Sequence, residues 1–298
     1  MISWFAVDWG TSNLRVWAMD AQDQVLKSYK SDKGMLALSG AHEFEAELLR
    51  LIDQDLTDGQ NQILACGMVG AKQGWIEAPY VATPCPPPGA ELAIQVPCLD
   101  PRLTVRILPG VKQLDPADVM RGEETQLAGF LSENPGFEGT ILMPGTHTKW
   151  VMISDGTIRS FCSVMTGELF ALLSEHSVLK HSVTTTDYDQ DAFEGGVTDN
   201  FDDPAGMMGR FFALRAADLV SGQTAAKARS RLSGLLIGAE LRAMAHEWQG
   251  KPIALLGRTA AAQQFERALT LLGGDYRVYD TETLTLAGLR AAYRQYAH

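Results

Sequence analysis

The sequence predicts an α/β protein built from two duplicated domains with a cleft between them. Three observations lead to this prediction. A strand–turn–strand–turn–strand pattern at the N-terminus recurs near residue 140, which is close to half of the 298 residues. Strands alternate with helices in the second half of the chain. The length itself favours about two domains of roughly 150 residues each.

The first repeat opens with residues 2–7, which are nearly all apolar, as in a central strand. A polar turn over residues 8–13 separates this strand from a second one over 14–19, and 24–29 are interpreted as a third. The remaining elements follow in order: a helix over 42–56, a strand over 62–66, a strand over 104–108 and a helix over 116–131.

Two irregular stretches divide this half of the chain. Residues 79–101 contain seven prolines and are predicted to be a long loop with at most one short strand, and such loops are often binding elements. Residues 132–136 have turn composition and mark the domain boundary. The prediction is therefore a first domain over 1–134 and a second over 135–298, with the last helix, 286–298, able to pack back on the first.

The second repeat resembles the first in residues as well as in element order. Gly10-Thr11 matches Gly145-Thr146 and Val16 matches Val151, each at an offset of 135 residues. An internal duplication is the simplest explanation. The predicted elements are strands over 140–143, 149–153 and 157–162, a mostly helical stretch over 167–248, a strand over 252–256, a helix over 260–271, a strand over 276–279 and a helix over 286–296.

Composition excludes several classes of protein. The net charge is −11 and there is no basic stripe, so a nucleic-acid partner is not expected. No apolar run approaches about 18 residues, so a membrane span is not expected either. The N-terminus lacks the basic and small-residue features of a signal peptide. The four cysteines are far apart, which favours free thiols in a reducing cytoplasm.

The first candidate site is the turn after the first predicted strand. Backbone N–H groups of Gly10, Thr11, Ser12 and Asn13, with the two hydroxyls, suit the oxygens of a phosphate chain. Asp8 stands at the end of the strand and would face a Mg²⁺ ion through water. The alternative is an ordinary β-hairpin with an Asx turn.

The second repeat supplies a matching turn, and Lys149 would add a point charge there. The alternative is again a plain hairpin, with His147 as a hydrogen-bonded turn residue. The chain has neither a P-loop nor a GxGxxG segment after a strand, so the two commonest nucleotide-binding folds find no support. The candidate nucleotide ligands of this second turn are Gly145, Thr146, His147, Thr148 and Lys149, following Pro144.

The third candidate is an acidic pair, Glu123 and Glu124, beside Arg121. Phosphoryl transfer to an alcohol needs a carboxylate that accepts the hydroxyl proton and orients the oxygen. Acids at a helix N-terminus, stabilised by the macrodipole, are the alternative. Asp118 is a further candidate, and the residues alone do not choose between the three carboxylates.

Two more segments carry weaker signals. Gly257 and Arg258 form a turn between a strand and a helix, where a nucleotide base or ribose fits over a glycine; an ordinary βα turn is the alternative. In the Gly-rich stretch 67–80, four side chains suit a small polar ligand, and a surface loop with an aromatic anchor is the alternative. These four are Lys72, Trp75, Glu77 and Tyr80.

Several segments together resemble the 2-dehydro-3-deoxygalactonokinase family, within the actin-like ATPase and sugar kinase superfamily. The resemblance covers nearly the whole chain. It departs from the wider superfamily at Pro144, where an Asp is usual, at Arg258, where a second Gly is usual, and at Glu123, which takes the place of the catalytic Asp. The segments that carry it are residues 8–15, 73–80, 121–126, 144–150 and 232–238.

The resemblance implies two ribonuclease-H-like (actin-like ATPase) domains, with ATP and Mg²⁺ as cofactors. It implies phosphorylation of the 6-hydroxyl of 2-dehydro-3-deoxy-D-galactonate, in galactonate catabolism. The alternatives are a kinase of the same fold for another sugar or sugar acid, such as the gluconate epimer, and a non-catalytic actin-like ATP-binding sensor. The expected partners are a small acid sugar and ATP. The sequence leaves the oligomeric state open, a homodimer included.

Overall fold

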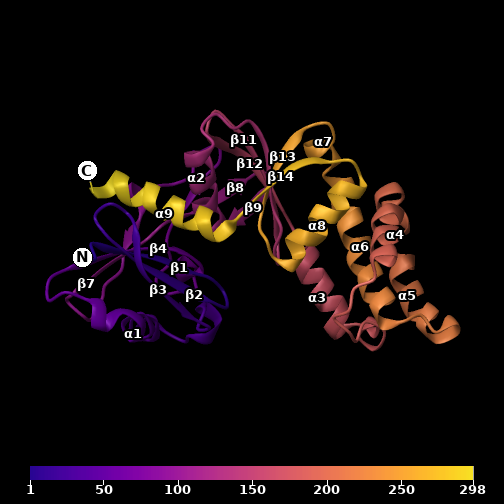
Figure 1. Ribbon diagram of the computed structural model, residues 1–298, viewed down its shortest axis with the longest axis horizontal. Coiled ribbons are helices and arrows are strands. Elements are labelled where there is room, and N and C mark those ends of the chain that lie inside the picture. Colours follow the sequence, from indigo (N-terminus) through magenta and orange to yellow (C-terminus); the bar gives the residue numbers. More distant parts are fainter. Residues whose placement is uncertain (298) are drawn as a thin grey trace. The chain divides into compact units, whose positions relative to one another are not determined.

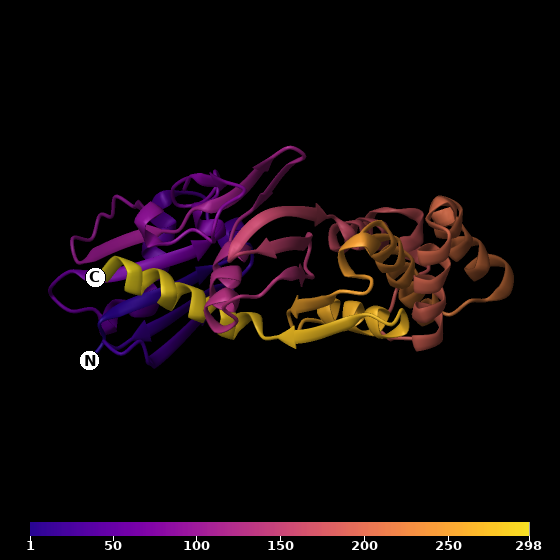
Figure 2. The ribbon, with the colours of Figure 1, turned by 90° about the horizontal axis from the view of Figure 1, so that it is seen from above.

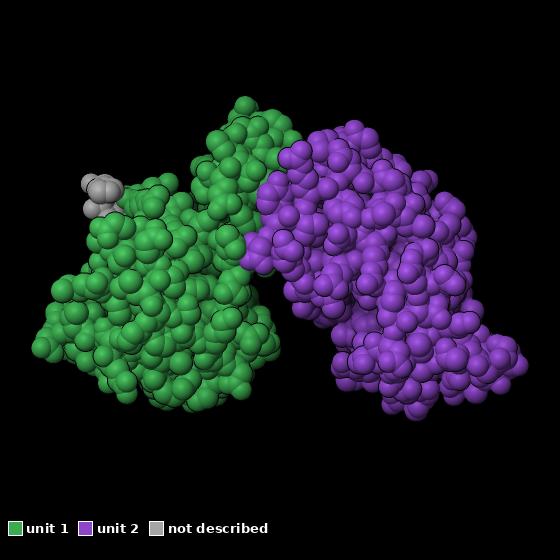
Figure 3. All heavy atoms as spheres, in the orientation of Figure 1, with its two compact units in different colours: residues 1–138, 153–160, 281–298 green, residues 139–152, 161–280 purple. Residues whose placement is uncertain are grey.

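The computed structural model describes residues 1–297, and the chain divides into two compact units (Figure 3). Unit 1 comprises residues 1–138 and 153–160 together with the C-terminal segment from Thr281, and unit 2 comprises residues 139–152 and 161–280. The first unit thus continues to Glu138 and includes the tip of a later hairpin as well as the last helix. His298, which ends the predicted helix 286–298, lies outside the described residues.

A six-stranded sheet forms the centre of unit 1, with the order β3-β2-β1-β4-β7-β6 (Figure 1). Strand β1 pairs antiparallel with β2 and parallel with β4, and β4 pairs parallel with β7. The central strand is apolar because both of its faces are covered. The bounds are β1 Trp4–Trp9, β2 Leu14–Met19, β3 Val25–Ser31, β4 Asn61–Gly67, β6 Ile94–Gln95 and β7 Leu103–Ile107.

Helices cover both faces of this sheet. On one face, Phe44 and Leu48 of α1 (Ala41–Ile52) pack in one cluster with Phe5, Val7 and Trp9. On the other face, the alternate side chains of β1 pack against α9 (Thr281–Ala297). Helix α9 lies beside α2 (Glu123–Glu133), as Figures 1 and 2 show.

A small sheet of three strands, in the order β5-β8-β9, completes unit 1. The predicted helix over 116–131 is wrong in its first half, because residues 117–120 form β9 and pair antiparallel with β8, with Val111 opposite Met120. The helix begins only at Glu123. The proline-rich stretch holds two short strands, β5 and β6, where at most one was expected. The bounds of the small sheet are β5 Tyr80–Ala82, β8 Gly110–Leu114 and β9 Ala117–Met120.

The sheet of unit 2 has the order β12-β11-β10-β13-β14. Strand β10 pairs parallel with β13, and β13 pairs parallel with β14. The outer part of the β11–β12 hairpin, residues 153–160, belongs to unit 1. The bounds are β10 Gly139–Met143, β11 Thr148–Ser154, β12 Thr157–Val164, β13 Pro252–Leu256 and β14 Asp275–Tyr279.

The two sheets confirm the predicted duplication. In each, the third, second and first strands of the repeat lie side by side, and two further strands follow beyond the first: β3-β2-β1-β4-β7 in unit 1 and β12-β11-β10-β13-β14 in unit 2. This shared strand order agrees with the two ribonuclease-H-like domains that the family resemblance implies. The two polar turns occupy equivalent places, each between the first and second strand of its repeat.

Unit 2 is otherwise helical. Helices α4 and α6 pack closely, because Gly234 and Gly238 face α4: an added Cβ would lie 2.1 Å from the carbonyl oxygen of Phe193 and 2.2 Å from that of Val197, respectively. Within residues 1–297, every helix is too short or too polar to cross a membrane. The bounds are α3 Thr166–His176, α4 Gln190–Asp202, α5 Met207–Ser221, α6 Ala225–Ala243, α7 Ala245–Trp248 and α8 Ala260–Leu271.

Candidate active site

The turn of unit 1 is tightly built and exposed at its tip. The N–H of Gly10 donates to the carbonyl oxygen of Asn13 at 2.9 Å, and the N–H of Met35 donates to the carbonyl oxygen of Gly10 at 3.0 Å. Residues 11–13 are exposed. Gly34 lies so close to the turn that an added Cβ would come within 2.4 Å of the backbone of Ser12. The turn therefore keeps its shape while its outer N–H groups face solvent.

Asp8 lies at the foot of this turn and is largely buried. Its carboxylate accepts from Arg15 at 2.5 Å, and Arg15 also binds Glu282 at 3.1 Å. Burial is the main influence on the Asp8 carboxyl and raises its pKa, although Arg15 opposes the change. The Sγ of Cys66, on the neighbouring strand β4, lies 4.0 Å from the carboxylate. Asp8 is thus a shielded acid, and it shares the Arg15 guanidinium with Glu282.

The acidic pair at the start of α2 belongs to the same neighbourhood. Gly67 ends β4 at φ +93°, and its added Cβ would lie 2.7 Å from the carbonyl oxygen of Trp9. Gly122 has φ +107°, and its Cβ would lie 3.2 Å from the Cα of Gly67. Positive φ at both positions requires glycine and lets the backbones approach. The first turn of α2 therefore lies beside the end of β1, where Asp8 stands.

Glu123 and Glu124 differ sharply in their surroundings. Glu124 is 1% exposed, and both of its oxygens accept from the N–H of Gly122 at 2.8 Å. Burial, followed by the nearby Glu123 carboxylate, raises the pKa of Glu124 to about 8. Glu123 is half-buried and accepts from the N–H of Arg121 at 2.9 Å. Asp118, the third candidate, lies on β9, opposite Gln113 of β8.

Arg121 is held rigidly by the Gly-rich segment. Its Nη2 donates to the carbonyl oxygen of Ala78 at 2.8 Å, its Nε donates to the hydroxyl of Tyr80 at 3.3 Å, and its guanidinium lies 4.1 Å from the centre of the Tyr80 ring. Its Nη1 is buried without a hydrogen-bond partner. Arg121 and Tyr80, two of the predicted site residues, are therefore in direct contact.

The other three residues predicted in this segment separate into two groups. Trp75 is 6% exposed and packs against Trp9 and Phe44, with ring centres 6.1 and 6.2 Å apart. This packing favours the aromatic-anchor interpretation for Trp75. Lys72 and Glu77 are exposed and accessible to a ligand.

The turn of unit 2 packs against the start of α3. The N–H of Glu168 donates to the carbonyl oxygen of Thr146 at 3.0 Å, and the Glu168 carboxylate lies 2.5 Å from Nε2 of His147. An added Cβ on Gly167 would lie 2.4 Å from the carbonyl oxygen of Gly145. The N-terminal end of α3, where N–H groups favour anions, is thus fixed against this turn.

Only part of this turn is accessible. Gly145, Thr146 and His147 are exposed. Thr148 is fully buried and its hydroxyl has no hydrogen-bond partner, whereas Lys149 is 6% exposed and donates to the hydroxyl of Ser163. Thr148 and Lys149 begin β11 and are buried. They can therefore influence a ligand bound outside the turn only by shaping the turn.

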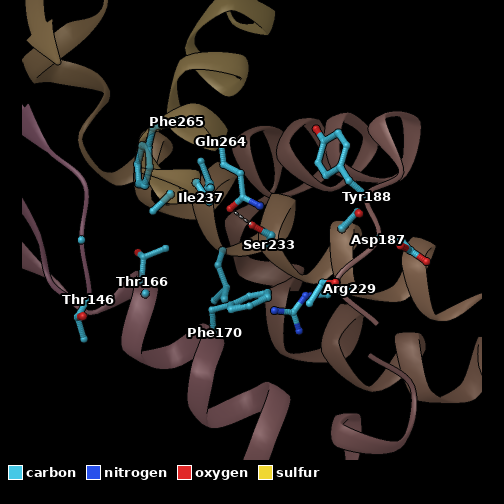
Figure 4. A pocket seen from close by; sticks show the side chains of 17 residues that line it. Thr146, Thr166, Phe170, Asp187, Tyr188, Arg229, Ser233, Ile237, Gln264 and Phe265 are labelled. Atoms are coloured by element: carbon cyan, nitrogen blue, oxygen red, sulfur yellow. Dashed lines mark hydrogen bonds between the residues drawn. The ribbon is translucent and has the colours of Figure 1, made fainter. Parts of the chain in front are cut away.

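A cavity of about 350 Å³ opens beside this turn, within unit 2. Its volume lies in the range of small-molecule sites, about 300–1,000 Å³. In Figure 4, Thr146 and Thr166 lie together at one end, and Asp187, Tyr188 and Arg229 lie at the other. The lining residues include Gly145, Thr146, Thr166, Gly167, Phe170, Thr186, Asp187, Tyr188, Arg229, Ser233, Ile237, Ala260, Ala261, Gln264 and Phe265.

Sequence reasoning missed most of this cavity. Ser233 of α6 donates to Oε1 of Gln264 on α8 at 2.8 Å, and both side chains line the cavity (Figure 4). Gly257 and Arg258, predicted to bind the adenosine, do not line the cavity. In this part of the chain the first lining residue is Ala260. One sequence signal could have located this part of the cavity wall: Thr259 is a typical helix N-cap residue. It caps α8 by accepting from the N–H of Ala262 at 3.2 Å, and the cavity lining on α8 starts directly after it.

The described residues contain no group of three or more His, Cys, Asp or Glu side chains arranged to hold a metal ion. This does not conflict with Mg²⁺, which is usually bound by one or two carboxylates together with waters and substrate phosphates. The half-shielded carboxylate of Asp8, beside an exposed turn of N–H groups, fits that mode of binding.

Comparisons with known proteins identify the family of this chain. The family model described as 2-keto-3-deoxy-galactonokinase matches residues 8–292. A protein of Rhizobium meliloti (strain 1021), named as a probable 2-dehydro-3-deoxygalactonokinase, is 37% identical over 97% of this chain and 96% of its own length. The 2-dehydro-3-deoxygalactonokinase of Escherichia coli (strain K12) is 33% identical, with 97% and 96% covered.

A solved structure gives the same result at the level of the fold. A crystal structure from Sinorhizobium meliloti, of a protein named after the same activity, has a TM-score of 0.90 at 36% identity, covering 98% of this chain and 99% of that one. Sequence and fold therefore agree over the whole length. The chain belongs to the 2-keto-3-deoxy-galactonokinase family of carbohydrate kinases.

Proposed function

We propose that this protein transfers the γ-phosphoryl group of ATP to the 6-hydroxyl of 2-dehydro-3-deoxy-D-galactonate, and that Glu123 is the general base. The observation that carries the proposal is the end-to-end match to a kinase family, combined with a cavity that opens beside a phosphate-type turn.

The nucleotide is assigned to the cavity of unit 2. Thr146 and the first turn of α3 offer N–H donors at one end, where the phosphates would lie. The purine and ribose would extend toward Ser233 and Gln264, whose side chains are held together by a hydrogen bond. Gln264 can pair a donor and an acceptor with adenine, which is a favoured pairing for an amide side chain.

The turn over residues 10–13 of unit 1 is proposed as a second binding element for the phosphate chain. Its outer N–H groups and the hydroxyls of Thr11 and Ser12 are exposed and available. Asp8 would hold Mg²⁺ through water, and the ion would neutralise charge on the phosphates. Burial of this carboxylate limits competition from bulk water.

The acid sugar is assigned to unit 1. Arg121, which Tyr80 and Ala78 hold in place, is the cation proposed for its carboxylate. Lys72 and Glu77 are exposed on the same segment and are proposed to bind sugar hydroxyls. Glu123 is preferred over Glu124 as the base, because Glu123 is half-buried and within reach of a substrate, whereas Glu124 is 1% exposed.

A coupled assay of ADP formation tests the proposal, with 2-dehydro-3-deoxy-D-galactonate and its gluconate epimer as acceptors. We expect turnover of the galactonate compound, with the phosphate on C6 of the product by NMR. Turnover of the epimer alone would assign another sugar acid to the same fold. Slow ATP hydrolysis at a rate that neither compound changes would contradict the kinase assignment and favour an ATP-binding sensor.

A further inference from the structure

A buried carboxylate in unit 2 connects three elements and plays no part in the chemistry proposed above. Glu240 of α6 is 3% exposed. Its Oε1 accepts from Nε1 of Trp150 on β11 at 2.7 Å, and its Oε2 accepts from the hydroxyl of Thr166, the first residue of α3. Within residues 1–297, no Lys, Arg or His side chain forms an ion pair with it. Within the described residues, the charged form of Glu240 is thus stabilised by two neutral hydrogen-bond donors and by no cation.

Thr166 links this carboxylate to the cavity. Thr166 and Gly167 line the cavity next to Gly145 and Thr146, as Figure 4 shows for the two threonines. The next residue of α3, Glu168, donates its N–H to Thr146. Thr166 therefore borders two environments: its hydroxyl donates to the buried carboxylate, and the residue lines the end of the cavity assigned to phosphates.

The carboxylate changes its protonation state near neutral pH. Burial raises the pKa of Glu240 to about 7, against the opposing effect of the hydrogen bonds from Thr166 and Trp150. Ionisable side chains on the surrounding elements contact other partners. They are His147 with Glu168, Lys149 with Ser163, Arg231 with Asp199, Arg242 with the ring of Phe201, and Glu247 with Thr140.

The two protonation states require opposite directions of one hydrogen bond. When Glu240 is ionised, it can only accept, so the Thr166 hydroxyl donates to it. When the oxygen facing Thr166 carries a proton, that oxygen donates and the Thr166 oxygen accepts. The hydrogen of Thr166 is then free to turn toward the cavity. An anionic phosphate oxygen placed there would accept it in a charge-assisted hydrogen bond.

We propose that Glu240 is a positioning residue that sets the direction in which Thr166 donates, and that nucleotide binding in this cavity draws up to one proton from solvent onto Glu240. The proton returns to solvent when the nucleotide leaves. The inference rests on the proposed function, because it assumes that the phosphates of ATP lie beside Thr166. It adds a link between proton uptake and nucleotide binding that the fold and the family do not specify.

Calorimetry measures the proton directly. A non-hydrolysable ATP analogue with Mg²⁺ is titrated into the whole protein at pH 7.5, in buffers that differ in ionisation enthalpy. We expect net proton uptake in the wild type and smaller uptake in Glu240→Gln, because the amide cannot take up a proton. The analogue's own ionisation contributes equally to both proteins, so their difference isolates Glu240.

Kinetics give a second readout. We expect the KM for ATP to rise with pH between 6 and 9 in the wild type, by up to about tenfold for each pKa unit that binding adds to Glu240. In Glu240→Gln, the amide nitrogen donates to Thr166 permanently, so the KM for ATP should stay low and nearly constant. The kcat and the KM for the acid sugar should change little in that variant.

Matched variants separate positioning from general loss of structure. Thr166→Val removes the hydroxyl and should raise the KM for ATP and abolish its pH dependence, whereas Thr166→Ser keeps the hydroxyl and should retain the wild-type profile. Glu247→Gln is the control: Glu247 also accepts from a threonine hydroxyl, that of Thr140 at 3.5 Å, but does not line the cavity. It should behave as the wild type.

The outcomes are distinguishable. Equal proton uptake by the wild type and Glu240→Gln, with parallel KM profiles, overturns this inference and leaves the kinase assignment intact. A wild type that binds no ATP analogue overturns the proposed function and this inference with it. If Glu240→Gln does not fold, Thr166→Val replaces it in the comparison. Proton uptake by Thr166→Val equal to that of the wild type would then overturn this inference.

Discussion

At the residue scale, burial separates carboxylates that the sequence presents as equals. Glu123 and Glu124 are neighbours with the same chemistry, and only the family resemblance, which aligns Glu123 with a catalytic Asp, ranks them in the sequence. The structure places Glu124 inside the fold, bound to the N–H of Gly122, and leaves Glu123 half-buried. A carboxylate that must accept a proton from substrate needs access to it. That difference supports Glu123 as the base. Glu124 instead stabilises the first turn of α2 through its hydrogen bond with the N–H of Gly122.

Glu123→Gln should lower kcat by about 100-fold or more, the scale of general-base loss. The amide keeps the size of the side chain but cannot accept the hydroxyl proton. Steady-state kinetics with saturating ATP and acid sugar check the prediction, and the KM values should change much less than kcat. Turnover close to that of the wild type would move the base to Glu124 or Asp118.

Glu124 makes a separate prediction about stability. Its pKa is raised to about 8 in the folded state, from an ordinary value of 4.5. The fold therefore favours the protonated form, and this contribution to stability is full below pH 4.5 and is lost as the pH rises through 8. The free energy of unfolding of Glu124→Gln should be close to that of the wild type near pH 5 and should exceed it at pH 9 by about 4 kcal/mol.

Chemical denaturation at several pH values measures this difference. The control is Glu133→Gln at the exposed end of the same helix, whose free energy of unfolding should follow the wild type at every pH. A constant difference between Glu124→Gln and the wild type across the range would mean that Glu124 is ionised in the folded protein throughout.

At the scale of elements, the sequence predicted strands and helices well where the apolar pattern is long, and failed where a distant partner decides. Residues 117–120 carry no strong local signal for a strand. They form β9 because β8 lies ready to pair, with the side chain of Gln113 bonded to the carbonyl oxygen of Pro116 at 2.8 Å. Strand pairing of this kind outweighs local propensity, so the predicted helix began too early.

Helix packing in unit 2 depends on a surface that only glycine provides. Gly234→Ala should destabilise the protein by about 1–3 kcal/mol, because the new Cβ would meet the carbonyl oxygen of Phe193 at 2.1 Å and force α4 away from α6. Gly209→Ala in α5 is the matched control, since an added Cβ there meets nothing within 4 Å. It should be neutral or stabilising by up to about 1 kcal/mol.

Thermal and chemical denaturation of the two glycine variants give the comparison. Equal destabilisation of both would show that loss of glycine itself, through the backbone, is the cause. An unchanged stability of Gly234→Ala would contradict the prediction, because it would show that α4 and α6 can move apart without loss of stability.

At the scale of the whole molecule, the duplication was visible in the sequence and the cavity was not. The repeat appears as matched residues at a fixed offset, such as Gly10 and Gly145, so one turn predicts the other. The cavity instead gathers residues from α3, α6 and α8, whose members Thr166, Ser233 and Gln264 share no motif. Only the packing of helices remote in sequence brings such residues together, and a single sequence contains no signal for it.

The chain also crosses between its units, and this has a consequence for folding. Helix α9 returns to unit 1 and buries Leu289 and Ala292 in the same cluster as Trp4 of β1. Its contact with α2 is close, since a Cβ on Gly129 would lie 2.0 Å from the carbonyl oxygen of Leu284. Residues 1–138 alone therefore lack the cover for one face of their sheet.

A chain of residues 1–138 should accordingly unfold without a cooperative transition, whereas the same residues joined by a flexible linker to 281–297 should regain one. The physical reason is that α9 supplies the apolar surface that completes the core, and burial of such surface is the main favourable term in folding. Urea denaturation followed by circular dichroism compares the two chains, and Leu289→Ala in the joined chain is the internal check. That substitution should cost about 2–5 kcal/mol, as for other large-to-small changes in a core. Cooperative unfolding of residues 1–138 alone, at the same urea concentration as the joined chain, would show that α9 is a passenger on unit 1 and not part of its core.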